Sequence, residues 1–144
     1  MTAIQIDTKP PLAAVTKLLV SSQLPTADIT DELLDNFFFA GDPSAPLGIV
    51  GLQIEPPFAL LRSLVVDAAS RSSGLGGRLL AHAEEHARAN GVRAVYLLTT
   101  TAESFFAKRG YSRAPRTEAP DFIRSSAEFA SLCPASAAFM LKQL

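Results

Sequence analysis

The chain has 144 residues, a length typical of a single domain with one hydrophobic core. It is 48% hydrophobic and 19% charged, and 13 basic against 14 acidic residues leave a net charge of −1. This balance argues against a nucleic-acid binder, because phosphate contacts need a basic excess, and no apolar run reaches the length of a membrane span. The single cysteine, Cys133, excludes an intramolecular disulfide and a thiolate metal cage, so we expect a reduced, cytoplasmic protein.

The first third of the chain predicts helices followed by an aromatic segment. Apolar residues recur every three or four positions over 12–20, directly after a proline pair, which predicts a helix there. A second short helix is expected over 31–34, and the Gly, Asp and Pro residues of 41–46 predict a loop. Phe37-Phe38-Phe39 is more typical of a core than of an interface, although it leaves a homodimer open as an alternative.

Two apolar segments around Pro56-Pro57 predict a β-hairpin. The strands are expected over 47–54 and 59–66, and the second is almost continuously apolar, as in strands that are buried on both faces. After this hairpin, apolar residues recur every four positions from Leu75 and predict a helix that ends at Asn90-Gly91.

Shorter elements alternate in the last third of the chain. The pattern predicts a strand over 93–99, a helix over 102–109 and a strand-like segment over 111–113. Residues 115–134 are rich in loop-forming residues, and 136–144 predict a last strand. This order of helices, hairpin and alternating elements predicts an α/β layered domain.

The segment 60–77 carries the strongest chemical signal. An apolar strand runs into Arg71-Ser72-Ser73-Gly74-Leu75-Gly76-Gly77, and an amphipathic helix follows directly. Glycines let the backbone approach a ligand closely, and the first amides of a helix lack partners within the helix and share its positive end. This predicts an anion site suited to a pyrophosphate. The alternative is a glycine-rich turn that binds nothing, and the glycine order fits neither a Rossmann turn nor a Walker loop.

The sequence Arg71-x-x-Gly74-x-Gly76, placed between an apolar strand and a long helix, resembles the acetyl-CoA pyrophosphate loop of the GCN5-related N-acetyltransferase (GNAT) superfamily. Lys108-Arg109-Gly110-Tyr111 resembles the closing signature of this family, and the matching segments cover residues 47–113. The resemblance implies one GNAT domain over 1–144 with the acyl-CoA N-acyltransferase fold, in the α/β (α+β) class. Its mixed, mostly antiparallel sheet would be splayed at the central strand and flanked by helices.

Two further resemblances concern the substrate. Tyr96-Leu97-Leu98-Thr99-Thr100, followed by Phe105-Phe106, is similar to the glutamate N-acetyltransferase branch, and the segment 60–142 is similar to small acetyltransferases of arsenic-resistance operons. These resemblances imply transfer of acetyl to the amine of a small acidic amino acid or of a glutamate-like toxin, with an organoarsenical as one such compound. The alternative is a non-catalytic sensor that binds acetyl-CoA, and turnover with any amine distinguishes the two.

The family resemblance implies acetyl-CoA as co-substrate, a small-molecule amine as acceptor and no metal. The amine would attack the thioester directly in a ternary complex, and the backbone amide of Val65 or of Val66 would stabilise the oxyanion. The strand would pair with the pantetheine arm, and the glycine-rich loop and a later helix would hold the rest of the cofactor. The predicted cofactor-binding residues are Leu64, Val65, Val66, Arg71, Ser72, Ser73, Gly74, Leu75, Gly76, Gly77, Arg78, Ala102 and Phe105.

Phe106 stands where many family members place a tyrosine that protonates the leaving thiolate. Ser63, Tyr111 and Ser104 are candidate substitutes, and departure of the unprotonated thiolate is the other alternative. For the base, Glu55 and an ordered water are the alternatives. The predicted catalytic groups are Ser63, Val65 and Tyr111.

An acidic acceptor needs arginine or hydroxyl groups to bind its carboxylates. Arg62 is the strongest candidate, because it lies on a core strand between Leu61 and Leu64. For each arginine the alternative is a solvated surface charge. The candidate substrate-binding residues are Arg62, Ser63, Thr99, Thr100, Arg113 and Arg116.

His82-Ala83-Glu84-Glu85-His86 has the spacing of a zinc peptidase motif, with both histidines on one helical face. It belongs to the helix after the glycine-rich loop and lacks an obvious third ligand, so we expect a charged, solvent-facing surface. Cys133 alone cannot build the thiolate cage that trivalent arsenic prefers, so an arsenic compound would act as a substrate.

Overall fold

A computed structural model describes residues 5–24, 26–71, 73–126, 129 and 136–144 of the chain. Within these ranges one seven-stranded sheet has the strand order β1-β2-β3-β4-β5-β7-β6. All neighbouring strands are antiparallel except β4 and β5, which are parallel, so the predicted mixed, mostly antiparallel sheet is confirmed. The strands are β1 (Ile6–Thr8), β2 (Phe37–Asp42), β3 (Ala45–Glu55), β4 (Phe58–Val66), β5 (Ala94–Thr99), β6 (Ser112–Arg113) and β7 (Ala138–Gln143).

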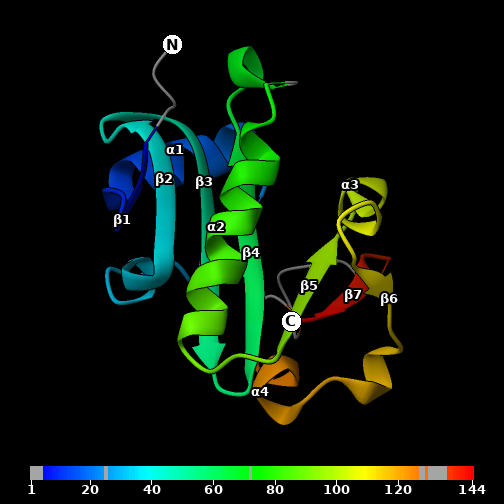
Figure 1. Cartoon of the computed structure of the whole chain (residues 1–144). Coiled ribbons are helices and arrows are strands. Elements are labelled where there is room, and N and C mark those ends of the chain that lie inside the picture. The colour runs from blue at the N-terminus through cyan, green and yellow to red at the C-terminus, as the bar shows by residue number, and fades with distance from the viewer. Residues whose placement is uncertain (1–4, 25, 72, 127–128, 130–135) are drawn as a thin grey trace.

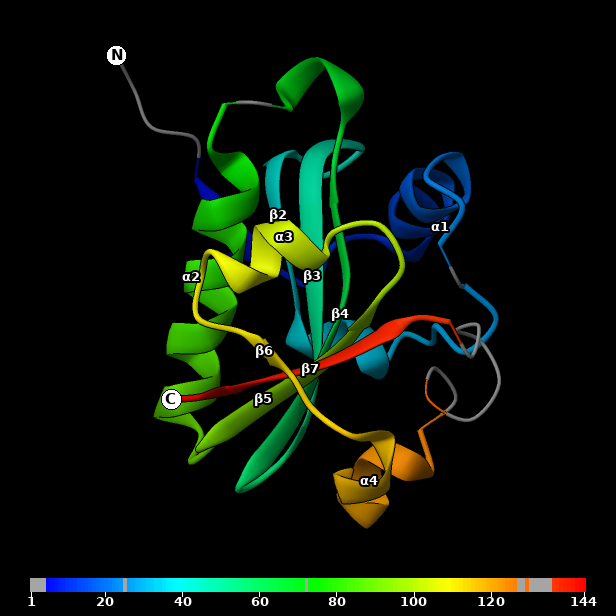
Figure 2. The same cartoon turned by 90° about the vertical axis from the view of Figure 1, so that its right-hand side faces the viewer.

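Helices cover both faces of the sheet. α1 (Leu12–Ser21) and α2 (Leu75–Ala89) lie on opposite faces of strands β2 to β4, whereas α3 (Glu103–Ala107) and α4 (Asp121–Arg124) belong to the C-terminal half (Figure 1, Figure 2). None of the helices in the described ranges has the length and apolar character needed to cross a membrane. Short 3-10 helices connect the larger elements: η1 (Leu33–Asn36), η2 (Ala68–Ser70) and η3 (Arg116–Glu118).

The three phenylalanines of β2 contribute to two cores. Side chains alternate between the faces of a strand, so Phe37 and Phe39 pack in the core under α1, whereas Phe38 packs in the core under α2. The Phe37 ring covers Gly51, its pairing partner on β3, where an added Cβ would lie 2.2 Å from a ring carbon. All three phenylalanines are buried, as their assignment to the core predicts.

β3 and β4 form the predicted hairpin. Its turn at Pro56-Pro57 contains a cis peptide bond and pairs Glu55 with Phe58. β4 is buried on both faces, because Leu61 packs in the core under α2 and Leu60 packs in a third core against α4 and β7. Burial on both faces therefore explains why the sequence of this strand is almost continuously apolar, as predicted.

The sheet opens between β4 and β5. The two strands pair over three positions, from Phe58 with Ala94 to Leu60 with Tyr96. Beyond this point β5 stays paired with β7 as far as Thr99, while β4 stays paired with β3. The free ends of β4 and β5 therefore diverge (Figure 1, Figure 2), which confirms the splayed central strand.

Several elements differ from the prediction. The sequence analysis did not identify β1 or β2, and the expected loop over 41–46 is a tight turn between β2 and β3. In this turn the Asp42 side chain accepts hydrogen bonds from the backbone N–H and the hydroxyl of Ser44, at 2.8 and 2.7 Å. The expected helix over 31–34 begins two residues later as η1, and the loop-rich stretch from 115 contains η3 and α4.

The two histidines of α2 lie against the sheet and do not form an open surface. His82 and His86 pack edge-on against Phe38, with ring centroids 4.8 and 4.9 Å apart. Glu84, between them, is buried and points toward the C-terminal half. The expectation of a solvent-facing surface is therefore wrong for these residues, and the described residues contain no group of three or more side chains able to hold a metal ion.

The contact of His86 with the sheet predicts a pH-dependent stability. Burial and the neighbouring His82 lower the pKa of His86 from its ordinary value of 6.5. The unfolded chain therefore takes up a proton here more readily than the folded protein does, so stability falls as the pH drops below about 6.5. The free energy of unfolding of the His86→Gln variant should depend less steeply on pH between about 7 and 5. Urea unfolding at a series of pH values measures both slopes, and parallel slopes would contradict the prediction.

Candidate functional site

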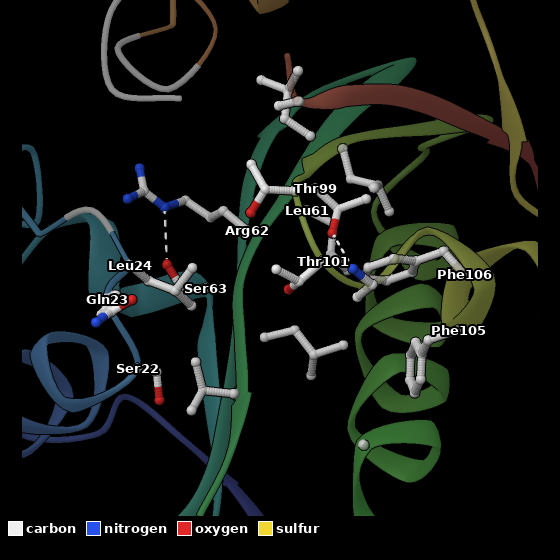
Figure 3. A pocket seen from close by; sticks show the side chains of 18 of the residues that line it. Ser22, Gln23, Leu24, Leu61, Arg62, Ser63, Thr99, Thr101, Phe105 and Phe106 are labelled. Atoms are coloured by element: carbon white, nitrogen blue, oxygen red, sulfur yellow. Dashed lines mark hydrogen bonds between the residues drawn. The ribbon is translucent and has the colours of Figure 1, made fainter. Parts of the chain in front are cut away.

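The divergence of β4 and β5 opens a cavity of about 880 Å³. It is lined by the chain after α1, by β4, and by the segment from β5 to α3 (Figure 3). Figure 3 shows Arg62 and Ser63 on one side of β4 with Ser22, Gln23 and Leu24, and Thr99, Thr101, Phe105 and Phe106 on the other side. The cavity is therefore lined by side chains from both sides of β4.

A β-bulge lies at the point where β4 leaves β5. The pairing with β3 shifts from Val65 opposite Ile49 to Arg62 opposite Gly51, so two residues of β4 face one of β3. Ser63 lies in this bulge with φ 58°, a left-handed conformation that is uncommon for a residue other than glycine. Since a bulge bends its strand and leaves the extra residue outside the ladder, it exposes the backbone of β4 to the cavity.

The edge of β4 that faces the cavity offers backbone partners to a ligand. Pairing with β5 ends at Leu60, so the following residues up to Val66 have no β5 partner on this side. Leu64, Val65 and Val66 all line the cavity. An extended ligand with amide groups could pair with such an edge as an added strand does.

The glycine-rich loop closes one end of the cavity. Gly74 precedes α2 with φ 83°, a left-handed conformation that favours glycine. The Arg71 side chain folds back onto β4, where its Nε donates to the carbonyl of Val66 at 3.1 Å. Arg71 and Gly76 line the cavity, so the positive end of α2 and one cation lie at its margin.

The structure places the predicted cofactor residues in two groups. Leu64, Val65, Val66, Arg71, Gly76, Ala102 and Phe105 line the cavity. Ser73, Gly74, Leu75, Gly77 and Arg78 form the loop and the first turn of α2, outside the cavity lining. Leu75 packs its side chain in the core under α2, so only its backbone is available to a ligand. Ser72 lies outside the described residues.

Arg109 adds a cation that the sequence analysis did not assign to the site. Its guanidinium lies 3.8 Å from the Phe105 ring centroid and donates to the Phe105 carbonyl at 2.9 Å. The same group lies 3.3 Å from the position of a Cβ on Gly77, in the first turn of α2. The spacing of four residues between Phe105 and Arg109 is the sequence signal that could have indicated this stacking.

Arg62 already binds a carboxylate in the structure. It is buried, and its Nη2 donates to Oδ1 of Asp28 at 2.8 Å while its Nη1 pairs with Oδ2. Its Nε donates to the Ser63 hydroxyl at 3.2 Å, and Nη1 also reaches the side-chain oxygen of Gln53 at 3.4 Å. Arg62 is thus one of the residues predicted from the sequence, whereas its partner Asp28 is not.

The structure distinguishes between the candidate acids, Ser63, Ser104 and Tyr111, and the candidate base, Glu55. Ser63 lines the cavity, whereas Ser104 and Glu55 are not among its lining residues. Tyr111 is also outside the lining, because its buried hydroxyl donates to Glu84 at 2.9 Å. Burial and the charge of Glu84 raise the pKa of Tyr111 far above its ordinary value. The structure therefore corrects the assignment of Tyr111 as an acid at this site.

Two of the predicted substrate-binding arginines are also not among the lining residues of the cavity. Arg113 is exposed and forms an ion pair with Glu103 at the start of α3. Arg116 donates to the carbonyl of Ala137 at 2.8 Å and lies over the Phe129 ring. Thr99, Thr100 and Thr101, the threonines at the end of β5, do line the cavity. Thr99 accepts a hydrogen bond from the N–H of Ala102 at 3.0 Å, which fixes the start of the α3 turn.

The chain is similar to known acetyltransferases. A model of the Acetyltransferase (GNAT) family matches residues 9–111. An amino-acid acetyltransferase of Ralstonia nicotianae is 40% identical over 58 residues, which are 40% of this chain and 13% of that protein. The match therefore spans a small part of that relative.

Two solved structures have the same fold. N-acetylglutamate synthase from Neisseria gonorrhoeae, complexed with coenzyme A and N-acetyl-glutamate, superposes with a TM-score of 0.82 at 19% identity. That superposition covers 100% of this chain but 36% of the synthase, so the chain spans little more than a third of it. A Mycobacterium tuberculosis protein in complex with CoA gives a TM-score of 0.78 at 20% identity, covering 97% of this chain and 99% of that one.

The position of Tyr111 predicts a role in stability. Glu84 accepts from the Tyr111 hydroxyl and also from Lys142 Nζ at 3.0 Å, so this network joins α2 to β7. Tyr111→Phe removes the hydrogen bond from the hydroxyl to the buried Glu84 carboxylate. It should therefore lower the free energy of unfolding by about 1.5–3 kcal/mol. Urea unfolding measures this loss. Glu85→Gln, which removes an exposed i,i+3 pair with Arg88, is the control and should change stability little; an equal loss in both variants would contradict the prediction.

Proposed function

Because this chain belongs to the GNAT family of acetyltransferases, we propose that it transfers acetyl from acetyl-CoA to the amine of a small acidic amino acid or of a glutamate-like compound. The observation that carries the proposal is the cavity between the diverging ends of β4 and β5. It joins a strand edge, a glycine-rich helix start and a buried arginine within one space. This combination provides sites for an amide-containing arm, a diphosphate and a carboxylate.

Acetyl-CoA fits the cavity by the chemistry of its parts. The free edge of β4 at Leu64, Val65 and Val66 would pair with the amides of the pantetheine arm. The amides at the start of α2, together with Arg71 and Arg109, would bind the diphosphate, because helix N-termini and guanidinium groups both favour anions. Coenzyme A is the ligand of the two solved structures described above, which supports this assignment.

The proposed reaction is a direct transfer in a ternary complex. The acceptor nitrogen attacks the thioester carbonyl carbon as the neutral amine, and the new C–N bond forms. The C–S bond breaks to release the CoA thiolate, and the nitrogen passes its proton to water, since Glu55 does not line the cavity. The chain holds the two reactants together and stabilises the oxyanion through the backbone N–H of Val65 or Val66. Phe106 lines the cavity but has no proton to give. Ser63 is the cavity-lining hydroxyl on β4, and since it accepts from Arg62, its own O–H is available to the leaving sulfur.

The acceptor would lie on the Arg62 side of β4. Arg62 would bind a carboxylate, and the hydroxyls of Ser63, Thr99 and Thr100 would bind further polar groups of an amino acid. The partial match to an amino-acid acetyltransferase and the N-acetyl-glutamate in the Neisseria structure support this substrate class. An organoarsenical analogue of glutamate carries the same amine and acid, so its acetylation in the cytoplasm is part of the proposal as a route to arsenic resistance. Cys133 lies outside the described residues.

Gly76→Glu tests the cofactor site. A Cβ on Gly76 would make ordinary contacts of 3.4 Å with Phe105 and 3.6 Å with Val66, so the variant should fold. Its carboxylate would then repel the diphosphate, and acetyl-CoA binding should weaken by about tenfold or more. Isothermal titration measures the affinity. Ala81→Glu, at an exposed position of α2, adds the same charge away from the cavity and is the control; unchanged affinity in Gly76→Glu would place the diphosphate elsewhere.

Release of CoA thiol from acetyl-CoA, measured against a panel of amines, tests the activity. The panel contains glutamate, its neutral isostere glutamine, lysine, and phosphinic and arsinic analogues of glutamate. We expect release with the glutamate-like amines above the rate with glutamine or lysine, because their acid groups can occupy Arg62. Tight acetyl-CoA binding without release with any amine would instead support a non-catalytic sensor, for which Phe106 is the structural argument.

A further inference from the structure

Arg62 is completely enclosed by partners from the chain itself. Its side chain has 0% exposure, although it lines the main cavity. Asp28 binds both terminal nitrogens, Ser63 accepts from Nε, and Gln53 accepts from Nη1. A guanidinium has five N–H donors in one plane and binds a carboxylate along one edge of that plane. Asp28 occupies the edge formed by the two terminal nitrogens.

Asp28 belongs to a segment without strand pairing, in which the neighbouring Ile29 packs against the core under α1. It lies between α1 and η1, where the described backbone bonds are those of turns, such as Ile29 N–H to Thr26 O at 3.1 Å. Its neighbours Thr26 and Ala27 line the main cavity. The Asp28 side chain retains 18% exposure, in contrast to the enclosed arginine. Of the two partners, the carboxylate is therefore the one that can turn away.

A second cavity lies on the far side of this ion pair. It has a volume of about 510 Å³, and both Asp28 and Gln53 line it. Asp28 and Gln53 are also the partners of Arg62, which lines the first cavity. The ion pair thus lies between the two spaces. The second one offers a displaced aspartate room and hydrogen-bond donors such as Asn36 and Ser125, although Glu32 also lines it.

The charges along the main cavity limit what an acidic ligand meets there. Among its described lining residues only Arg62 and Arg71 are charged. Arg71 lies at the glycine-rich loop, bonded to the end of β4. Among the described lining residues, Arg62 is therefore the single cation at the end away from this loop, and Asp28 is its ion-pair partner. A second carboxylate added to this pair would meet a like charge without a compensating cation.

We propose that Asp28 is a specificity-determining residue that holds the place of the acceptor's carboxylate on Arg62. An acidic acceptor binds by exchange: its carboxylate replaces that of Asp28, which turns toward the second cavity, and the buried guanidinium stays paired throughout. A neutral acceptor binds without this exchange. The inference rests on the proposed function, since it assigns the acid group of the acceptor to Arg62. Asp28 acts through Arg62 and is a positioning residue.

Binding of glutarate tests the exchange without any turnover, because glutarate has two carboxylates and no amine. Asp28→Asn preserves the size of the side chain and removes its charge, so glutarate should bind about tenfold more tightly than to the wild type. Asp35→Asn, at a largely exposed ion pair with Lys9, is the matched control and should leave the affinity unchanged. The double variant Asp28→Asn with Arg62→Gln should lose the gain. Equal affinity in Asp28→Asn and wild type would overturn the proposal.

Steady-state kinetics separate specificity from a structural role. In Asp28→Asn the KM for glutamate should fall about tenfold relative to the KM for glutamine, while kcat for both stays within about twofold. A parallel change for both acceptors would show a structural role only and would overturn the proposal. If no amine releases CoA thiol from the wild type, the proposed function fails, but the glutarate affinities still decide whether Asp28 competes for Arg62.

Hydrogen exchange of the wild-type protein gives a test that needs no variant. Saturating glutarate should increase amide exchange in the segment 26–31, because displacement of Asp28 releases its anchor, whereas the neutral glutaramide should not. Unchanged exchange in this segment with bound glutarate would overturn the proposal.

Discussion

The early end of the pairing between β4 and β5 is the constraint on which the rest of the structure depends. A strand edge in the interior of a sheet exposes backbone N–H and C=O groups that need partners. Here the pairing stops after three residues, and β5 is held instead by β7 on its other side. The bulge at Ser63, the glycine start of α2 and the α3 turn all border the space that this separation creates. The cavity is thus a property of the sheet topology and not of a surface loop.

Two charged networks join segments that are far apart in the sequence. On one face, Glu84 of α2 binds Tyr111 and Lys142 and so attaches the C-terminal strands to the long helix. On the other, Arg62 of β4 binds Asp28 and attaches the chain after α1. Buried ion pairs add little net stability, but the loss of one partner is costly, so they fix which arrangement forms. Of the two, only the Arg62 pair borders the cavity.

The features that could be predicted depend on patterns of neighbouring residues, whereas those that could not depend on contacts between residues far apart in the sequence. The hairpin, α1 and α2 follow from local periodicity, and the glycine-rich segment indicated where a ligand would bind. β2 was missed because Phe37, Phe38 and Phe39 are all buried, which removes the alternation that marks a half-exposed strand. Asp28 lies 34 residues from Arg62, and no local pattern links them. Tyr111 was misassigned because its neighbourhood in the chain does not tell where its hydroxyl points.

The arrangement of the phenylalanines on β2 has a consequence for how this chain can change in evolution. Since neighbouring side chains serve opposite layers, deletion or insertion of one residue in β2 would exchange the contents of the two layers. The Phe37 ring also fixes the register of β2 against β3, because a side chain at position 51 would collide with it. A change of length is therefore costly within the strand and easier to accommodate in the turn at Pro43 and Ser44, which do not line the cavity.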